Sequence, residues 1–256
     1  MANNAIGIDV SKWQGRMDWV KARAAGARFA YIRAGSTGVT GGMVEDSQFR
    51  NNVLAADVLP VGYYWYFNQH YSGKAQAEKF IEAAGGAPWH LPPAVDAEVR
   101  NIWPMTPYKA SQNLMDFCGY VTEGFRLPPI IYTRGELFNS AFAGAGWLGN
   151  RRLWIARYSE TLAHPWADAA QFKPFCWGEW DFWQYSADKN GRGPEFGAES
   201  RDIDVDRFNG DEAAFVAWVA AHGRGEAGLV NTPALPVPLT LEERVTALEG
   251  AVFGTG

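Results

Sequence analysis

Residues that would support a metal-dependent or disulfide-stabilised fold are scarce in this sequence. Among its 256 residues are two cysteines, Cys118 and Cys176, which lie far apart and form no CxxC pair. Four histidines are scattered, without an HExxH motif or a pair at i, i+4. A disulfide framework, a cysteine-rich metal site and a zinc hydrolase site therefore lack a basis in the sequence. We expect both cysteines to be free and buried, and we expect no metal and no cofactor.

Strong net charge and long apolar runs are also missing. The 23 Lys and Arg residues against 28 Asp and Glu residues leave a formal net charge of −5, without the clustered positive charge typical of nucleic-acid binders. No segment reaches the length of a membrane span, and the opening MANNAIGIDV lacks the basic and apolar regions of an export signal. We therefore expect no nucleic-acid partner, no membrane insertion and synthesis without a signal peptide.

Aromatic residues are what the sequence has in excess. It holds 12 Trp, 10 Tyr and 15 Phe, and 47% of its residues are hydrophobic. A chain of this length can bury one large core. The flat, amphipathic rings fit two uses, packing in that core or lining a cleft that binds carbohydrate.

Eight short runs of β-branched and aromatic residues alternate with helix-like stretches, which is typical of repeated βα units. The runs are Ile6–Val10, Phe29–Arg33, Val61–Phe67, Ala94–Val99, Ile130–Thr133, Leu153–Tyr158, Asp181–Tyr185 and Ile203–Phe208. The helical stretches are Trp19–Ala25, Glu45–Ala56, Lys74–Ala84 and Tyr108–Glu123. After Thr133 the connections are short and rich in Gly, Pro and Trp. We predict a single α/β domain over residues 1–222, an irregular TIM-like barrel that is regular only in its first half.

The composition changes after this domain. Residues 223–239 are rich in Gly and Pro and predict a linker. In residues 240–253, Thr240 and Glu243 fit a capping box, and apolar residues follow at spacings of 4, 3 and 4. This pattern predicts a short amphipathic helix. It either docks on its own domain, lies in solvent, or supports weak self-association.

Carboxylates end three of the eight runs. Asp9 closes the first, Asp96 and Glu98 close the fourth, and Asp204 and Asp206 lie in the eighth, which neighbours the first in a closed barrel. Residues two apart in a strand project to the same side. Crowding of such acids raises the pKa of at least one of them, which places a protonated acid beside an ionised base.

A carboxylate cluster of this kind supports either binding of a divalent cation or cleavage of a glycosidic bond. Flat, hydrogen-bonding side chains at the neighbouring strand ends favour cleavage, because sugar rings have apolar faces and hydroxyl edges. The side chains that we expect to bind substrate there are Tyr64, Trp65, Tyr132, Tyr158, Trp183 and Gln184. For each aromatic residue, the alternative is packing inside the barrel.

Seven segments, taken in order and spacing, resemble the glycoside hydrolase family 25 lysozymes, the Chalaropsis-type muramidases. They are GIDVSKWQG (7–15), PVGYYWYF (60–67), AVDAEV (94–99), IIYTR (130–134), LWIARY (153–158), FWQYS (182–186) and IDVDRFNG (203–210). The resemblance implies a (β/α)5(β)3 barrel. It also implies hydrolysis of the β-1,4 bond between N-acetylmuramic acid and N-acetylglucosamine in the glycan strands of bacterial peptidoglycan.

The resemblance further implies roles for individual residues. Glu98 matches the general acid, and Asp96, Asp9 and Asp204 match acids that position the substrate or stabilise the transition state. Arg33 stands where relatives often carry Lys, which implies a substrate contact with altered geometry. Retention of configuration through the substrate's N-acetyl group and retention through a protein nucleophile both stay open, and a carboxyl separation of about 5 to 5.5 Å would favour the protein nucleophile.

The expected setting is a bacteriophage endolysin that is made in the host cytoplasm, released through a holin-type lesion and active on the cell wall. A virion-associated lytic protein and a non-catalytic peptidoglycan-binding module are the alternatives. A zinc amidase or a cysteine peptidase acting on the same polymer is disfavoured by the dispersed histidines and distant cysteines.

Overall fold

The computed structural model describes residues 4–98, 105–167, 172–187 and 191–224. Most of the predicted linker and all of the predicted helix at 240–253 lie outside these residues. Eight strands close into a barrel, because β1 pairs with both β2 and β9. They are β1 (Ile6–Val10), β2 (Ala27–Thr37), β4 (Val61–Tyr66), β5 (Ala94–Asp96), β6 (Ile130–Thr133), β7 (Leu153–Ala156), β8 (Phe182–Ala187) and β9 (Asp204–Phe208). The barrel confirms the predicted fold class.

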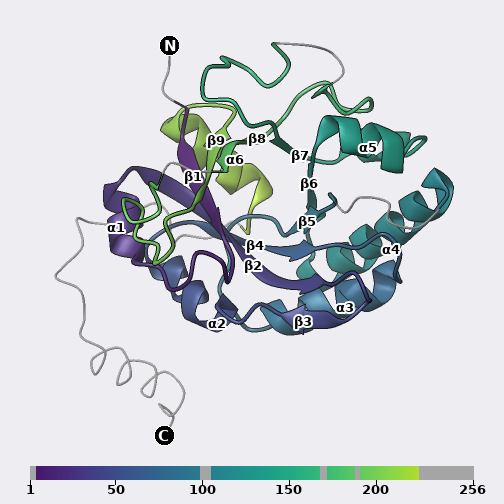
Figure 1. Ribbon diagram of the computed structural model, residues 1–256, viewed down its shortest axis with the longest axis horizontal. Coiled ribbons are helices and arrows are strands. Elements are labelled where there is room, and N and C mark those ends of the chain that lie inside the picture. Colours follow the sequence, from purple (N-terminus) through teal and green to yellow (C-terminus); the bar gives the residue numbers. More distant parts are fainter. Residues whose placement is uncertain (1–3, 99–104, 168–171, 188–190, 225–256) are drawn as a thin grey trace, which may run out of the picture. The chain divides into compact units, whose positions relative to one another are not determined.

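The connections explain why the barrel is irregular. Strands β1 to β8 of the barrel are parallel, and β9 runs antiparallel to both of its neighbours. The helices are α1 (Trp19–Ala24), α2 (Phe49–Asn52), α3 (Gly73–Ala84), α4 (Pro107–Phe125), α5 (Gly135–Ala141) and α6 (Glu212–His222), with 3₁₀ turns η1 (Val53–Asp57) and η2 (Gly146–Asn150). Five βα units are thus followed by three strands (Figure 1).

Two local predictions need correction. The stretch Glu45–Ala56 is not one helix: Glu45 ends a short strand, β3 (Met43–Glu45), which forms a hairpin with β2, and α2 and η1 follow. Cys118 is free and buried as expected, whereas Cys176 is free but only half-buried. No helix in the described part of the chain is long and apolar enough to cross a membrane.

The helices begin where the sequence offers capping side chains. Ser72 accepts a hydrogen bond from the N–H of Ala75 at the start of α3, and Thr106 accepts one from Lys109 at the start of α4. Such bonds satisfy amide groups that the first helical turn leaves unpaired. The face of α4 that the spacing of Leu114, Phe117, Cys118 and Val121 predicts as apolar is buried. The capping side chains therefore fix where α3 and α4 begin, and the spacing of apolar residues fixes which face of α4 is buried.

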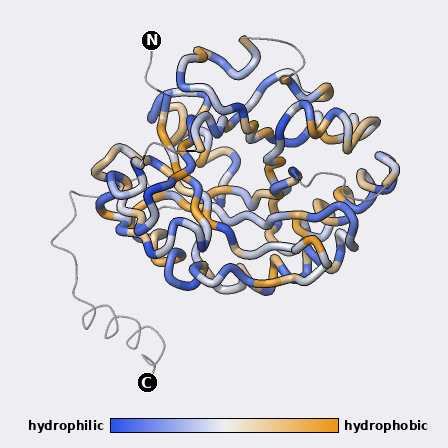
Figure 2. The backbone as a smooth tube through the Cα atoms, in the orientation of Figure 1, coloured by the Kyte–Doolittle hydropathy of each residue, from blue (hydrophilic) through white to orange (hydrophobic). Residues whose placement is uncertain are grey.

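Alternation along the strands divides the core into two layers. Outward-facing residues such as Ile8, Ile32 and Ile155 pack under the helices. In Figure 2 the most hydrophobic stretches follow the strands at the centre of the molecule.

Inward-facing aromatic rings close one end of the barrel. Phe29 and Phe182 meet edge to face with ring centroids 5.1 Å apart, and Phe182 and Phe208 contact Trp218 of α6. Phe215 of α6 stacks on Phe29 with centroids 5.1 Å apart. Helix α6 therefore plugs the end of the barrel at which the parallel strands begin, and only the opposite end is left for a site.

Candidate active site

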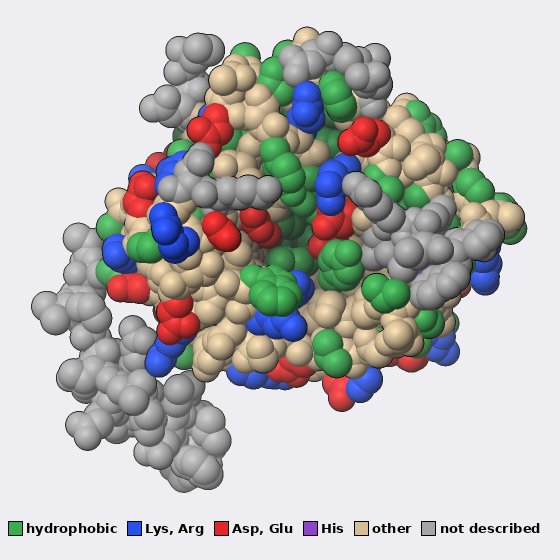
Figure 3. Space-filling view, viewed as in Figure 1, with side chains coloured by type: hydrophobic (Ala, Val, Ile, Leu, Met, Phe, Trp, Pro, Cys, Tyr) green, Lys and Arg blue, Asp and Glu red, His purple; other side chains and the backbone are tan. Residues whose placement is uncertain are grey.

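A cavity of about 450 Å³ opens at the end of the barrel where the parallel strands finish, which is where barrel enzymes place their sites. Figure 3 shows a hollow in the middle of this face with Asp and Glu side chains around it. The strand residues that line it are Asp9, Arg33, Ser36, Thr37, Tyr64, Tyr66, Asp96, Tyr132, Trp154, Gln184 and Asp204. Residues of the following loops, Glu98 and Tyr158 among them, complete the wall.

All four predicted acids reach this cavity from three strands. Asp9 comes from β1, Asp96 from β5 with Glu98 just after it, and Asp204 from β9. Asp9 and Asp204 are direct partners in the β1–β9 ladder. Closure of the barrel thus joins acids that are 195 positions apart in the sequence.

Asp9 is buried and held by a chain of hydrogen bonds. The Tyr132 hydroxyl donates to Gln184 Oε1 at 2.7 Å, and Gln184 Nε2 donates to Asp9 Oδ2 at 2.7 Å. Burial raises the pKa of Asp9 well above its usual value, and the nearby charges of Asp204 and Asp206 raise it further. Asp9 is therefore a rigidly placed carboxyl that favours its neutral form.

Asp96 has the raised pKa that the DxE spacing predicts. Burial is the largest cause, the charge of Glu98 adds to it, and Arg33 and Arg134 oppose it. Asp96 Oδ1 is buried and accepts no hydrogen bond from any residue that the structure describes. A buried carboxyl without a donor favours the protonated state.

Glu98 is fixed by an arginine to which the sequence analysis assigned no role. Arg134, the residue before α5, donates from Nε at 3.0 Å and from Nη2 at 2.8 Å, both to Glu98 Oε2. Oε1 accepts no hydrogen bond from the described part of the chain, which leaves it open to a ligand. The signal for this pair was the position of Arg134 directly after β6, the strand beside β5.

Arg33 lines the cavity as predicted, and a missed acid orients it. Asp46 Oδ2 lies 2.7 Å from Arg33 Nε and 2.6 Å from Nη2, and it also accepts the Lys12 N–H at 3.0 Å. Asp46 is buried. It therefore joins the loop after β1 to Arg33 within β2 and holds the guanidinium at the cavity wall.

The predictions for Trp65 and Trp183 are wrong. Both side chains are buried on the outer face of the barrel, where Trp65 Nε1 donates to Thr37 Oγ1 at 3.0 Å and Trp183 Nε1 donates to the Arg157 carbonyl at 2.7 Å. Their neighbours Tyr64 and Gln184 point inward. Adjacent strand residues face opposite sides, so no strand could have placed both members of either pair in the cavity.

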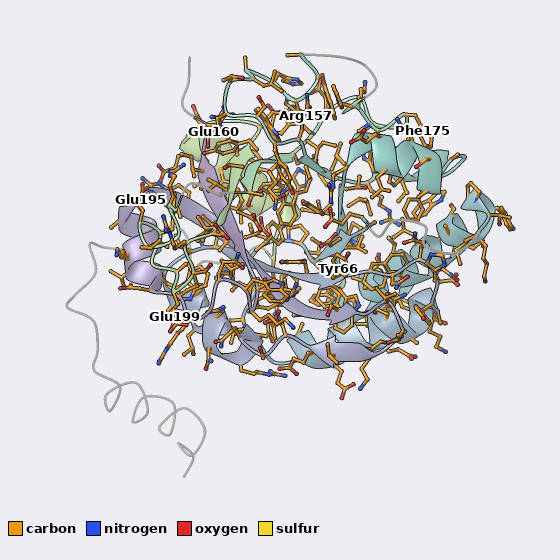
Figure 4. The ribbon with its side chains drawn as sticks, in the orientation of Figure 1. Tyr66, Arg157, Glu160, Phe175, Glu195 and Glu199 are labelled. Atoms are coloured by element: carbon orange, nitrogen blue, oxygen red, sulfur yellow. The ribbon has the colours of Figure 1, made fainter. Side chains whose placement is uncertain are left out.

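Three further aromatic side chains line the cavity and were missed. Trp154 follows the inward parity of β7, and its ring meets that of Tyr132 edge to face with centroids 4.7 Å apart. Tyr66, labelled in Figure 4, follows Tyr64 by two residues on β4. Trp13 stands at the rim and is 69% exposed. Strand parity was the signal for Trp154 and Tyr66.

The arrangement is suited to acid chemistry on a glycan. Two buried carboxyls that favour their neutral forms, Asp9 and Asp96, lie in one cavity with Glu98 and Asp204, and tyrosine and tryptophan rings form its walls. Among the described residues, no group of three His, Cys, Asp or Glu side chains is arranged to hold a metal ion.

Known proteins share this architecture and sequence. Residues 8–193 match the model of the family described as glycosyl hydrolases family 25. Lysozyme M1 of Streptomyces globisporus is 31% identical over 225 residues, which cover 82% of this chain and 70% of that protein. A bacterial lysozyme structure from Streptomyces coelicolor has a TM-score of 0.68 and 26% identity and covers 86% of this chain and 97% of its own. A muramidase structure from Acremonium alcalophilum has a TM-score of 0.65 and 28% identity, with coverage of 84% and 99%.

Proposed function

Because the chain belongs to glycosyl hydrolase family 25 and is a lysozyme-type glycoside hydrolase that degrades peptidoglycan, we propose how its cavity cuts the polymer. The bond broken is the β-1,4 linkage between N-acetylmuramic acid and N-acetylglucosamine. Glu98 is the general acid, and Asp9, Asp96 and Asp204 surround the sugar whose anomeric carbon reacts. The convergence of these four acids in one aromatic-walled cavity carries the proposal.

Glu98 is assigned as the acid because of how it is held. Arg134 occupies Oε2 with two N–H groups, so Oε1 is the oxygen that carries the proton and gives it to the departing glycosidic oxygen. A proton donor of this kind must lie within hydrogen-bond reach of the leaving oxygen. Arg134 supports that geometry by fixing the rotamer of Glu98.

The remaining acids stabilise the positive charge that develops on the sugar in the transition state. Glycoside hydrolysis passes through an oxocarbenium-like transition state, and preorganised polar and charged groups stabilise such charge most where water is excluded. Asp9 is held in place by Gln184, and Asp204 is its ladder partner. Asp96 or Asp204 orients the substrate's N-acetyl group, whose carbonyl oxygen bonds to the anomeric carbon as the glycosidic bond breaks. Water then attacks the anomeric carbon, gives up a proton to Glu98 and releases the N-acetyl group.

Side chains on the cavity walls bind the glycan. Tyr64, Tyr132 and Gln184 reach the cavity from within the barrel, and the half-exposed Tyr158 stands at its edge. Their hydroxyl and amide groups suit sugar hydroxyls, and their rings suit the apolar sugar faces. Arg33 contributes a positive charge on the same wall, where it can contact an acidic group of the polymer.

Digestion of purified peptidoglycan followed by mass spectrometry tests the proposed bond. The expected products end in N-acetylmuramic acid with a new reducing end, and the Glu98→Gln variant releases them far more slowly. New amino groups without new reducing ends would mean that a peptide or amide bond is cut, and this would overturn the proposal. Equal rates for the two proteins would overturn the role of Glu98.

We further place the enzyme in phage lysis, with synthesis in the host cytoplasm and release to the wall through a holin-type lesion. Peptidoglycan lies outside the inner membrane, so a hydrolase made in the cytoplasm needs such a path. Expression in a bacterial host is expected to cause lysis only when a holin is expressed with it. Lysis by the hydrolase alone, or its recovery in assembled virions, would contradict this setting.

The heptad-like segment at 240–253 is proposed to support weak self-association. The 256-residue chain is expected to sediment faster as its concentration rises, whereas a chain that ends at Arg224 should keep full turnover and sediment at a rate that changes little with concentration. The same dependence of sedimentation on concentration in both chains would contradict the proposal.

A further inference from the structure

A fifth acid, Asp206, lies beneath the four that face the cavity. It is completely buried on β9, two residues from Asp204, on the same inward side of the strand. Its Oδ1 accepts a hydrogen bond from Trp154 Nε1 at 2.8 Å. Its Oδ2 is also buried and receives no N–H or O–H from the residues that the structure describes. Of the two carboxyl oxygens of Asp206, Oδ1 therefore accepts a hydrogen bond from the described residues and Oδ2 does not.

The side chain that the β1–β9 ladder places beside Asp206 is the carboxyl of Asp9, and the charge of Asp206 raises the pKa of Asp9. In the β1–β9 ladder, Asp206 pairs with Gly7, which has no side chain. The next inward-facing residue on β1 is Asp9, two positions further along, and its carboxyl is therefore the nearest side chain of β1 to Asp206 along the ladder. Two ionised carboxylates are acceptors only and cannot bond to each other. A hydrogen bond between these side chains requires one proton between them.

The surroundings of the pair favour that proton. The other titratable groups that face Asp206 are Asp204 on its own strand and Tyr31 on β2. Strands β7 and β8 present uncharged side chains, Trp154 and Gln184. No lysine or arginine is among the groups that shift its pKa. Two negative charges in contact at a dry site without a cation are strongly unfavourable.

We propose that Asp206 is a positioning residue, which shares one proton with Asp9 and so keeps Asp9 directed at the cavity with a single negative charge on the pair. This inference rests on the proposed function of Asp9. Gln184 holds Asp9 from one side and Asp206 holds it from below. Burial raises the pKa of Asp206 to about 8, and the pKa of Asp9 is raised as well.

The pair sets an alkaline limit on the site. While the pH stays below the raised pKa of Asp206, about 8, the proposed proton is shared between the two carboxyls. Above that pH the proton is lost and both groups are ionised, so their repulsion displaces Asp9 from Gln184. An amide at position 206 offers Asp9 a permanent N–H donor of nearly the same shape, whereas an aliphatic side chain offers none.

Carbon NMR of the complete chain, labelled at the aspartate carboxyl carbon, tests the shared proton without any assay of catalysis. In the wild type, a carboxyl signal is expected to titrate near pH 8. It should disappear in Asp206→Asn, and the signal absent from Asp9→Asn should titrate at lower pH in Asp206→Asn than in the wild type. Absence of any aspartate titration above about pH 6, or an unchanged titration in Asp206→Asn, would overturn the proposal.

The pH profile of kcat/KM tests positioning. Asp206→Leu is expected to lose about tenfold in kcat/KM near pH 6, because Asp9 loses a bonding partner. Asp206→Asn should recover most of that loss and should lack the decline near pH 8. A purely structural role predicts the same profile shape in all three proteins. If the glycosidic bond proved not to be the target, the NMR titration would still decide whether the proton is shared.

Discussion

The inward-facing residues of the same strands differ between the two ends of the barrel: aromatic rings fill one end, and carboxyls line the other. Along β9, Phe208 lies at the closed end, Asp206 lies in the middle and Asp204 reaches the cavity; β8 likewise runs from Phe182 to Gln184. Each step is two residues, which keeps the side chain on the inner face. The closed end stabilises the fold by burying rings, and the open end holds carboxyls that burial makes hard to ionise. Each step moves about 7 Å along the strand. The inner surface of the barrel therefore changes, within a few residues, from tightly packed rings to the carboxyls of the proposed active site.

Replacing Glu98 by Gln breaks the open end with the largest effect. A positioned general acid contributes on the order of 10² to 10⁴ in rate, so Glu98→Gln is expected to lower kcat by about a thousandfold with little change in melting temperature. Release of reducing sugar from purified peptidoglycan measures it. Glu136→Gln, an exposed residue in α5, is the matched control and should keep wild-type kcat. A loss of less than tenfold for Glu98→Gln would contradict its role.

Replacing Phe182 by Ala breaks the closed end. Its ring contacts Phe29, Phe208 and Trp218, and removal of such a buried ring costs about 3 to 5 kcal/mol in the free energy of unfolding. Chemical denaturation measures it. The folded fraction should keep kcat within about threefold, because no proposed catalytic acid is changed. Phe175→Ala, at a half-exposed position, should cost much less, and equal costs would refute the difference between the ends.

Replacing Asp96 by Asn tests, through the pH dependence of stability, whether burial at the open end makes a carboxyl hard to ionise. The pKa of Asp96 is raised in the folded state, so its contribution to stability is complete below the unfolded-state pKa near 4 and is lost as the pH rises through the folded-state value. An amide does not ionise. Relative to wild type, Asp96→Asn is therefore expected to gain thermal stability as the pH rises from about 4 to neutrality, while it loses activity. A stability difference that does not vary with pH would contradict this.

Replacing Trp13 by Ala is expected to have the smallest effect. This side chain is 69% exposed at the rim, so its loss should leave stability within about 0.5 kcal/mol of wild type. KM for soluble glycan fragments should rise about threefold to tenfold if the ring stacks on a sugar. Tyr108→Ala on α4, which is 73% exposed and does not line the cavity, is the control. Equal KM values in both variants would remove Trp13 from the binding surface.

Patterns within strands and helices made much of the fold predictable. The strands were visible as short apolar runs between turn residues, and the apolar face of α4 was visible in its spacing. The acids were predictable because strand ends converge in a closed barrel. Where the prediction failed at Trp65 and Trp183, it ignored the alternation that places Tyr64 and Gln184 inside.

Contacts between separate strands and loops were not predictable from such patterns. The bond from Arg134 to Glu98 depends on the rotamers of two residues on neighbouring connections. The bond from Arg33 to Asp46 depends on the β2–β3 hairpin, and the sequence analysis placed its last residue, Glu45, together with Asp46 in a helix. Side-chain partners of this kind follow from tertiary geometry, and so the charged pairs that orient the site became visible only in the structure.

A structure of the Glu98→Gln variant with a bound peptidoglycan fragment tests the central claim most directly. The account predicts a glycan across the open end, with the glycosidic oxygen within about 3.2 Å of the side chain at position 98. Asp9, Asp96 and Asp204 are expected around the sugar on the side of its anomeric carbon. A glycan bound elsewhere, or a glycosidic oxygen out of reach of position 98 while another acid contacts it, would contradict the account.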